Sequence, residues 1–202
     1  MISILPSIIK LEQLNLSLQE ITDRLIASFL SSKHNCCPKC NRKLLKRLCS
    51  YERNISDYRN GSIEDITIKT NRYICKCGSS HVLLPSLIIP YRRNSFILIV
   101  HALYDYYSHN DSVEGICRKY QISIPTLYRW KKCFEADKVL YLKSLKDMEL
   151  SAYGFIRQIL EEYDIRDFMN EFVKENPERR LFLQNMRKAH SQRKVKSSCF
   201  PS

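Results

Sequence analysis

The chain has 202 residues, of which 44% are hydrophobic, so it can form one ordinary domain or two small ones with packed cores. This composition excludes a disordered chain, and no apolar run approaches the roughly 18 residues of a membrane-spanning helix. The net charge of +12 favours a polyanionic partner such as nucleic acid. An acidic protein surface or an anionic lipid surface would also satisfy the charge.

The first segment, residues 1–33, is expected to be helical from about Leu16 onward and to pack on the rest of the protein. It lacks the basic start and the small-residue cleavage site of a secretory signal, so we expect a cytoplasmic protein. In a reducing compartment, the nine cysteines favour metal ligation over disulfides.

Residues 34–93 carry the pattern of a zinc ribbon followed by a linker. Cys37 and Cys40 form a C-x-x-C turn, and Cys75 and Cys77 form a second group 34 residues later. Between the groups, a Gly61 turn and alternating isoleucines predict short β-strands. Four cysteines presented by two such turns would bind a structural Zn²⁺ in a closed site with no place for water.

The second cysteine group is less regular than the first, because its spacing is C-x-C. Cys75 and Cys77 are preferred as ligands, since Gly78 supplies the open backbone of a metal-binding turn, and His81 is the reserve ligand. Weaker reserves are His34, Cys36 and Cys49. Cys117 and Cys133 fall in helical segments, where a cysteine commonly packs as a small hydrophobic residue.

Positive charge is concentrated in two segments. Residues 34–93 contain 12 Lys and Arg against 4 acids, and residues 179–202 contain 7 against none. Arg92 and Arg93 lie at the end of an extended segment whose prolines disfavour helix, and they are candidates for phosphate contact or for ordinary solvation.

Residues 94–136 predict a three-helix, helix-turn-helix unit. A first helix is expected over 96–108. A second begins after the capping residue Ser112 and carries apolar residues at positions 113, 116, 117 and 120. Gln121 occupies a turn position that usually suits glycine. A third helix follows Ser123, with Pro125 in its first turn and Leu127 and Trp130 on its apolar face.

The exposed face of this third helix, expected over residues 123–134, has the composition of a DNA recognition helix. Its side chains are of the types that reach phosphates and base edges in a major groove. The candidate DNA-binding residues are Ser123, Thr126, Tyr128, Arg129, Lys131 and Lys132, together with Arg92 and Arg93. The competing interpretation is a helical hairpin that only packs.

The last segment, residues 137–202, is predicted to be a helical extension with a basic tail. Apolar residues recur at helical spacing in 155–163, in 168–173 and in 181–186. No strand pattern is present to align acidic residues into a catalytic site, so no catalytic residue is assigned. The helices could cover the helix-turn-helix or form a homodimer, and the tail 179–196 could contact phosphate or stay solvated.

Several of these motifs resemble a known family when read in order. They are Cys37-Pro-Lys-Cys40, then Cys77-Gly-Ser-Ser-His-Val-Leu-Leu-Pro85, then Pro90-Tyr91, and then Ser112 to Trp130 followed by Lys131-Lys132. Over about residues 34–150 the chain resembles small bacterial zinc-ribbon and helix-turn-helix proteins of unknown function, which are similar to the DNA-binding front ends of insertion-sequence transposases. The resemblance implies metal ligation by Cys37, Cys40, Cys75 and Cys77, a place for His81 in the ribbon turn, and a DNA face that includes Thr126, Tyr128 and Arg129. It implies no catalytic residue.

The sequence therefore predicts an α+β protein that binds Zn²⁺ and duplex DNA and has no catalytic activity. Such a protein would be either transposase-related or a transcriptional regulator. Two alternatives remain open. The chain could be the DNA-binding subunit or remnant of a transposase whose catalytic chain is separate, or a protein-interaction module that uses its zinc ribbon.

Overall fold

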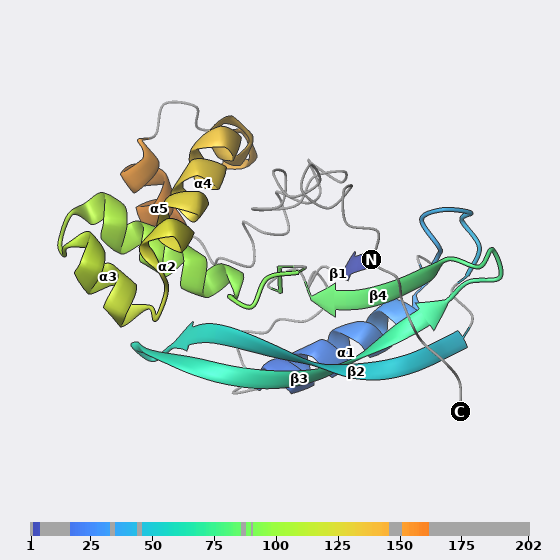
Figure 1. The fold of residues 1–202 in the computed structure, drawn as a ribbon. Helices are drawn as coiled ribbons and strands as arrows, with labels where there is room; N and C mark the ends of the chain where they lie inside the picture. The colour runs from blue at the N-terminus through green and yellow to red at the C-terminus, as the bar shows by residue number, and fades with distance from the viewer. Residues whose placement is uncertain are drawn as a thin grey trace.

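A computed structural model describes residues 2–4, 17–32, 35–43, 46–85, 88–89, 91–145 and 151–161. It shows a twisted sheet with one helix on its face, and a group of helices at one end of that sheet (Figure 1). The α+β class expected from the sequence is confirmed. The helices expected over 168–173 and 181–186, and the basic tail, lie outside the described residues.

A long β-hairpin forms the centre of the sheet. β2 (Lys46–Arg59) pairs antiparallel with β3 (Ser62–Ile74) through a two-residue turn. Asn60 and Gly61 in that turn have φ values of 50° and 81°, as a type I′ hairpin turn requires. β4 (Ser80–Pro85) continues the antiparallel sheet, and β1 (Ile2–Ile4) adds to β4 in parallel, giving the order β1-β4-β3-β2. The Gly61 turn and strands between the two cysteine groups are confirmed, but β2 and β3 have 14 and 13 residues and are not short.

One face of the sheet is covered by α1 (Leu18–Ser31), which confirms the helix expected in the first segment. A capping box starts the helix, because the Ser17 side chain accepts from the Glu20 amide while the Glu20 carboxylate accepts from the Ser17 amide. Leu25 and Ile26 of α1 pack with Tyr73 and Leu83 of the sheet. These contacts lie beside the cysteine turns.

The remaining described helices build the second core. They are α2 (Phe96–Ser108), α3 (Val113–Lys119), α4 (Ile124–Leu145) and α5 (Ala152–Glu161). Trp130, Tyr120, Phe134 and Phe155 are almost fully buried among them. The bounds expected for α2 are confirmed, and α5 overlaps the helix expected over 155–163 but begins three residues earlier. The bounds expected for the third helix were too short, because α4 continues to Leu145. Nothing between 135 and 145 breaks a helix, since that stretch contains neither Pro nor Gly.

The hairpin and the helices are joined by hydrogen bonds as well as by packing. The backbone of Ser56 in β2 pairs with the segment before α2, where its amide donates to the Arg93 carbonyl and its carbonyl accepts from the Ser95 amide. Asp57, only 2% exposed, accepts from the Ser95 hydroxyl at 2.5 Å and from Arg59 Nε at 2.8 Å. The hairpin end therefore has a fixed position against α2.

Within the described part of the chain, no helix has both the length and the apolar character needed to cross a membrane.

Candidate metal centre and nucleic-acid surface

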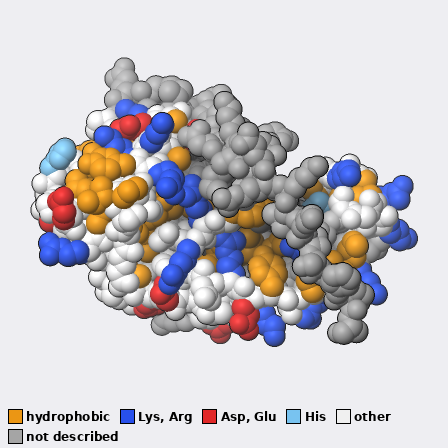
Figure 2. Space-filling model, viewed as in Figure 1, with side chains coloured by type: hydrophobic (Ala, Val, Ile, Leu, Met, Phe, Trp, Pro, Cys, Tyr) orange, Lys and Arg blue, Asp and Glu red, His pale blue; other side chains and the backbone are white. Residues whose placement is uncertain are grey.

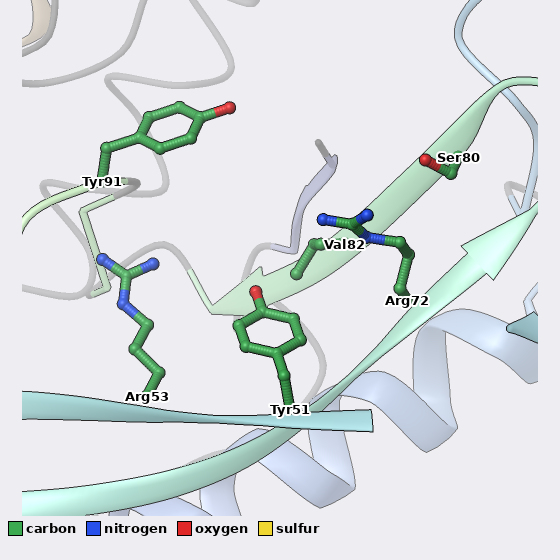
Figure 3. Close-up of a pocket in the computed structure, with 6 residues that line it drawn as sticks. All are labelled: Tyr51, Arg53, Arg72, Ser80, Val82 and Tyr91. Carbon is green, nitrogen blue, oxygen red and sulfur yellow. The ribbon is translucent and has the colours of Figure 1, made fainter. Parts of the chain in front are cut away.

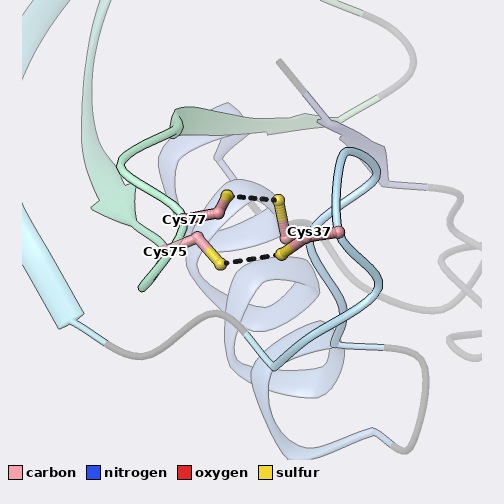
Figure 4. Close-up of side chains that lie close together, drawn as sticks. Cys37, Cys75 and Cys77 are labelled. Atoms are coloured by element: carbon pink, nitrogen blue, oxygen red, sulfur yellow. Dashed lines mark hydrogen bonds between the residues drawn. The ribbon is translucent and has the colours of Figure 1, made fainter.

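Four cysteine side chains converge beside α1, at the end of the sheet that lies far from α2 to α5 (Figure 1 and Figure 4). Cys37 and Cys40 come from the turn between α1 and β2, and Cys75 and Cys77 come from the turn between β3 and β4. The two turns are alike. The Asn41 amide donates to the Cys37 carbonyl at 2.7 Å, and the Gly78 amide donates to the Cys75 carbonyl at 2.9 Å.

A residue with positive φ follows the last cysteine of each turn, Asn41 at 56° and Gly78 at 80°. A positive φ turns the backbone around the sulfur atoms. Glycine and asparagine suit this position because they adopt a positive φ more readily than other residues.

The sulfur geometry fits a tetrahedral metal site. The four sulfur atoms lie within 4.8 Å of one another, with Cys37 to Cys77 at 3.7 Å and Cys40 to Cys75 at 3.4 Å. A tetrahedron with metal–sulfur bonds of about 2.3 Å has sulfur–sulfur edges of about 3.8 Å. A disulfide would need about 2.05 Å, and all four are free thiols. The cluster could therefore hold a metal ion.

Two neighbouring side chains lie against individual cysteines of the cluster. Hydrogen bonds from the side chain and backbone of Ser79 lower the pKa of the Cys77 thiol to about 6. The His81 Nε2 atom lies 3.2 Å from the Cys37 sulfur, within hydrogen-bonding distance. Hydrogen bonds to a thiolate ligand orient it and stabilise its charge, so His81 is placed to support Cys37 rather than to replace one of the four cysteines.

The reserve ligands are separated from the cluster or cannot be placed. Cys36 and Cys49 are outside the group of converging sulfurs, and Cys49 is exposed. His34 lies outside the described residues. Cys117 and Cys133 are buried in the helical core, as expected.

α3 and the first part of α4 lie where the sequence predicted helices. The Ser112 hydroxyl accepts from the Gly115 amide and caps α3. Ile116, Cys117 and Tyr120 are buried, and after a short turn Leu127 of α4 is buried against them. Asp105 of α2 fixes the end of α3, because its carboxylate accepts from Lys119 Nζ at 2.6 Å and from the Tyr120 hydroxyl at 2.9 Å.

Gln121 adopts the left-handed conformation expected at the turn, with a φ of 49°. This conformation costs a non-glycine residue about 1 kcal/mol or more, and the Gln121 side chain is exposed. Gln121→Gly is therefore expected to stabilise the protein by about 0.5–1 kcal/mol, measured by urea denaturation. Gln121→Ala is the control and should give no gain, because alanine keeps the steric penalty.

The predicted DNA-binding residues of α4 lie in two places: some are exposed to solvent, and others contact side chains of α2. Arg129 and Lys132 are exposed, and Ser123 is exposed just before the helix. Tyr128 is 46% exposed and makes an edge contact with the Tyr106 ring of α2.

Lys131 lies on the same side as Tyr128. Its ammonium group is 5.1 Å from the centre of the Tyr106 ring and 3.6 Å from the Glu135 carboxylate. The hydroxyl groups of Thr126 and Ser123 lie 2.9 Å apart. Among the predicted DNA-binding cations of α4, Arg129 and Lys132 are therefore less engaged with described residues of the protein than Lys131.

The linker arginines differ from each other. Arg93 is exposed and forms an ion pair with Asp65 of β3 at 2.6 Å. Arg92 is half-buried, and its Nε atom is buried without a hydrogen-bond partner among the described residues. Burial lowers the pKa of Arg92; of two smaller effects, Cys133 raises it and the positive charge of Arg129 lowers it. Arg129 is thus near enough to Arg92 to affect its charge, although 37 positions separate them in the sequence.

Lys and Arg side chains are spread over both the helical end and the sheet end of the face shown in Figure 2, where acidic side chains are fewer. The sequence did not single out Arg53 of β2, whose Nη2 atom donates to the Ile89 and Arg92 carbonyls, each at 2.5 Å. Arginines at residues 53 and 92 are thus linked through the backbone of the segment before α2. No local pattern in the sequence indicates such a contact.

These features define a class of protein: an α+β chain with a four-cysteine cluster that could hold a metal ion and a packed pair of helices joined by a short turn. Residues 37–130 match the family described as a domain of unknown function (DUF6431). The match begins at the first cysteine of the cluster and ends at Trp130 in α4, so it includes the cluster, α3 and the first part of α4. No curated protein matches the chain. No solved structure matches it either.

Proposed function

We propose that the protein is a zinc-containing protein that binds duplex DNA and catalyses no reaction itself. In this proposal α3, the turn and α4 act as a helix-turn-helix, and the first half of α4 enters the major groove. The cysteine-bearing sheet acts as a zinc ribbon that supports the helices and adds phosphate contacts.

Zinc is the metal proposed for the cluster because four thiolates in a closed tetrahedral arrangement suit it best. Zn²⁺ has no redox chemistry, and with four protein ligands it would have no position for a substrate. Cys37, Cys40, Cys75 and Cys77 would hold it, and its contribution would be to the stability of the fold.

The observation that carries the DNA-binding proposal is the buried Nε atom of Arg92, which has no acceptor among the described residues. A buried donor without a partner is costly, and the exposed Arg129 of α4 adds positive charge to the surroundings of Arg92. An anion bound by Arg92 and Arg129 would supply the missing acceptor. A DNA phosphate beside the recognition helix is such an anion, and arginine binds it with charge-assisted hydrogen bonds.

The test is a fluorescence-anisotropy titration of the zinc-loaded protein with a random-sequence duplex at several salt concentrations. We expect binding that weakens steeply with salt, because bound phosphates release counterions. Arg129→Ala should weaken binding by about 1–3 kcal/mol, as expected for loss of a good arginine contact to the duplex.

Arg24→Ala is the matched control, since Arg24 is an exposed arginine on α1, which covers the sheet. It removes the same charge without touching α4 and should change the affinity much less. Equal effects of the two substitutions would mean that the protein attracts DNA only through its total charge. No binding to the duplex at low salt would overturn the proposal.

The biological setting is proposed as transposition or transcriptional control, with a homodimer or a separate transposase chain as the further partner. Strand transfer that appears only when a catalytic chain is added would select the first setting. A two-fold symmetric preferred site, found by selection from random duplexes, would indicate a dimer.

A further inference from the structure

A pocket of about 360 Å³ lies between the sheet and the segment that leads to α2 (Figure 3). Its walls come from every antiparallel strand and from this segment, and the lining residues are Tyr51, Arg53, Arg72, Ser80, Val82 and Tyr91. The volume is within the range of small-molecule sites. Among the described residues, no cysteine of the cluster and no residue of α4 lines the pocket, so the function proposed above does not account for it.

Tyr91 stands at the rim of this pocket in an unfavourable state. Its side chain is 75% exposed, and its φ is 62°, which costs a non-glycine residue about 1 kcal/mol or more. Figure 3 shows its ring standing clear of the strands, above the positions of Tyr51 and Arg53. Because the ring is mostly exposed, its burial contributes little free energy to offset the backbone strain at Tyr91. The exposed ring is therefore a candidate surface for a ligand.

The charge inside the pocket is positive. Arg53 is fixed by its bonds to the Ile89 and Arg92 carbonyls and so holds the segment that carries Tyr91. Arg72 is exposed, and it forms no ion pair with an acid in the part of the chain that the structure describes. None of the described lining residues is acidic.

Tyr51 adds a neutral hydrogen-bond donor to the pocket. It is half-buried on β2, and burial raises the pKa of its phenol, so the hydroxyl keeps its proton at neutral pH. A site with a free guanidinium, a phenol donor and an exposed aromatic face offers complementary groups to an anion that also carries a flat ring.

We propose that this pocket binds a nucleoside phosphate unit of single-stranded DNA, with the base stacked on Tyr91 and the phosphate held by Arg72. Stacking of bases on aromatic side chains together with a basic surface is the usual way in which single strands are bound. A base inside a duplex has both faces covered by its neighbours, so an intact duplex cannot fill the site. The proposal goes beyond duplex binding by α4 and does not depend on it.

The experiment compares binding of a labelled oligothymidylate and of a labelled random duplex to the full zinc-loaded chain. Arg72→Ala should weaken binding of the single strand at least about fivefold. Tyr91→Gly should do the same while leaving the melting temperature unchanged or higher, because glycine adopts the positive φ without strain. The duplex affinity of both variants should stay within about twofold of the unsubstituted protein.

Lys69→Ala is the matched control, because it removes an exposed charge from β3 outside the pocket. Displacement of labelled oligothymidylate by thymidine monophosphate distinguishes a free nucleotide from a strand as the ligand. Complete displacement by the monophosphate at concentrations similar to those at which the oligonucleotide binds would assign the site to a free nucleotide. Displacement only at much higher concentrations would assign it to a single strand. Oligothymidylate binding that is the same in Arg72→Ala, Tyr91→Gly and Lys69→Ala would overturn the proposal. Failure of duplex binding alone would count against the α4 surface and leave this pocket intact.

Discussion

Replacement of Cys75 by serine is expected to abolish stoichiometric zinc binding and to unfold the cysteine-bearing end of the sheet. Cys75 is 3% exposed, and its sulfur lies 3.4 Å from that of Cys40. Structural zinc contributes about 10 kcal/mol or more to small domains that it holds together, far more than one packed side chain. Metal content by atomic spectroscopy and far-ultraviolet circular dichroism of the purified variant would measure both effects.

Cys49→Ser is the control for this substitution, because Cys49 is exposed on β2 and lies outside the cluster. It should keep one zinc ion per chain and an unchanged spectrum. Chelation of the metal from the unsubstituted protein should reproduce the Cys75→Ser spectrum. A fully folded, metal-free Cys75→Ser variant would show that packing of α1 on the sheet is sufficient, and the structural role of zinc would then be wrong.

The cysteine turns could be predicted from the sequence because their signal is local. The spacing of Cys37 and Cys40, and glycine directly after Cys77, are properties of a few consecutive residues that physical chemistry links to metal-binding turns. The same holds for the Asn60-Gly61 turn and for the buried positions of α3 and α4, where helical spacing marks the packed face.

The position of charged side chains on α4 was harder to predict, because it depends on a neighbouring helix. Helical spacing puts Lys131 next to the presumed DNA face, yet its ammonium group contacts Tyr106 and Glu135. Only the packing of α4 against α2 determines which side a long side chain takes. The sequence therefore supplied the candidates, and the structure separates Arg129 and Lys132 from the rest.

No pattern in the sequence predicted the contact between the hairpin and the helices. Asp57 looks like any polar residue in a strand, and Ser95 like an ordinary helix cap, and 38 positions separate them. Their contact arises from the way the hairpin end folds against α2. The same reason explains why the pocket lined by Arg72 and Tyr91 was not foreseen, since its residues come from distant segments.

Asp57→Ala is the second substitution for which we expect a large effect, a loss of about 3 kcal/mol in the free energy of unfolding. The change leaves the buried Ser95 hydroxyl without its acceptor and removes the partner of Arg59, and a buried polar group without a partner costs about 1–3 kcal/mol. Urea denaturation followed by the fluorescence of Trp130, which is buried in the helical core, would measure it.

Arg93→Ala tests whether burial is the cause of that loss, because it removes an Arg–Asp ion pair in an exposed position and leaves the hydrogen bond from Ser56 to Asp65 in place. The side chains of Arg93 and Asp65 are 63% and 55% exposed, and such pairs contribute at most about 1 kcal/mol. Asp57→Asn should fall between the two, since its amide oxygen can still accept from Ser95 but carries no charge for Arg59. Equal losses for Asp57→Ala and Arg93→Ala would contradict the assignment of Asp57 as the residue that fixes the sheet to α2. If the assignment holds, Asp57→Ala should also weaken duplex binding, because the sheet and α4 would no longer keep one relative position for contacts on the same DNA.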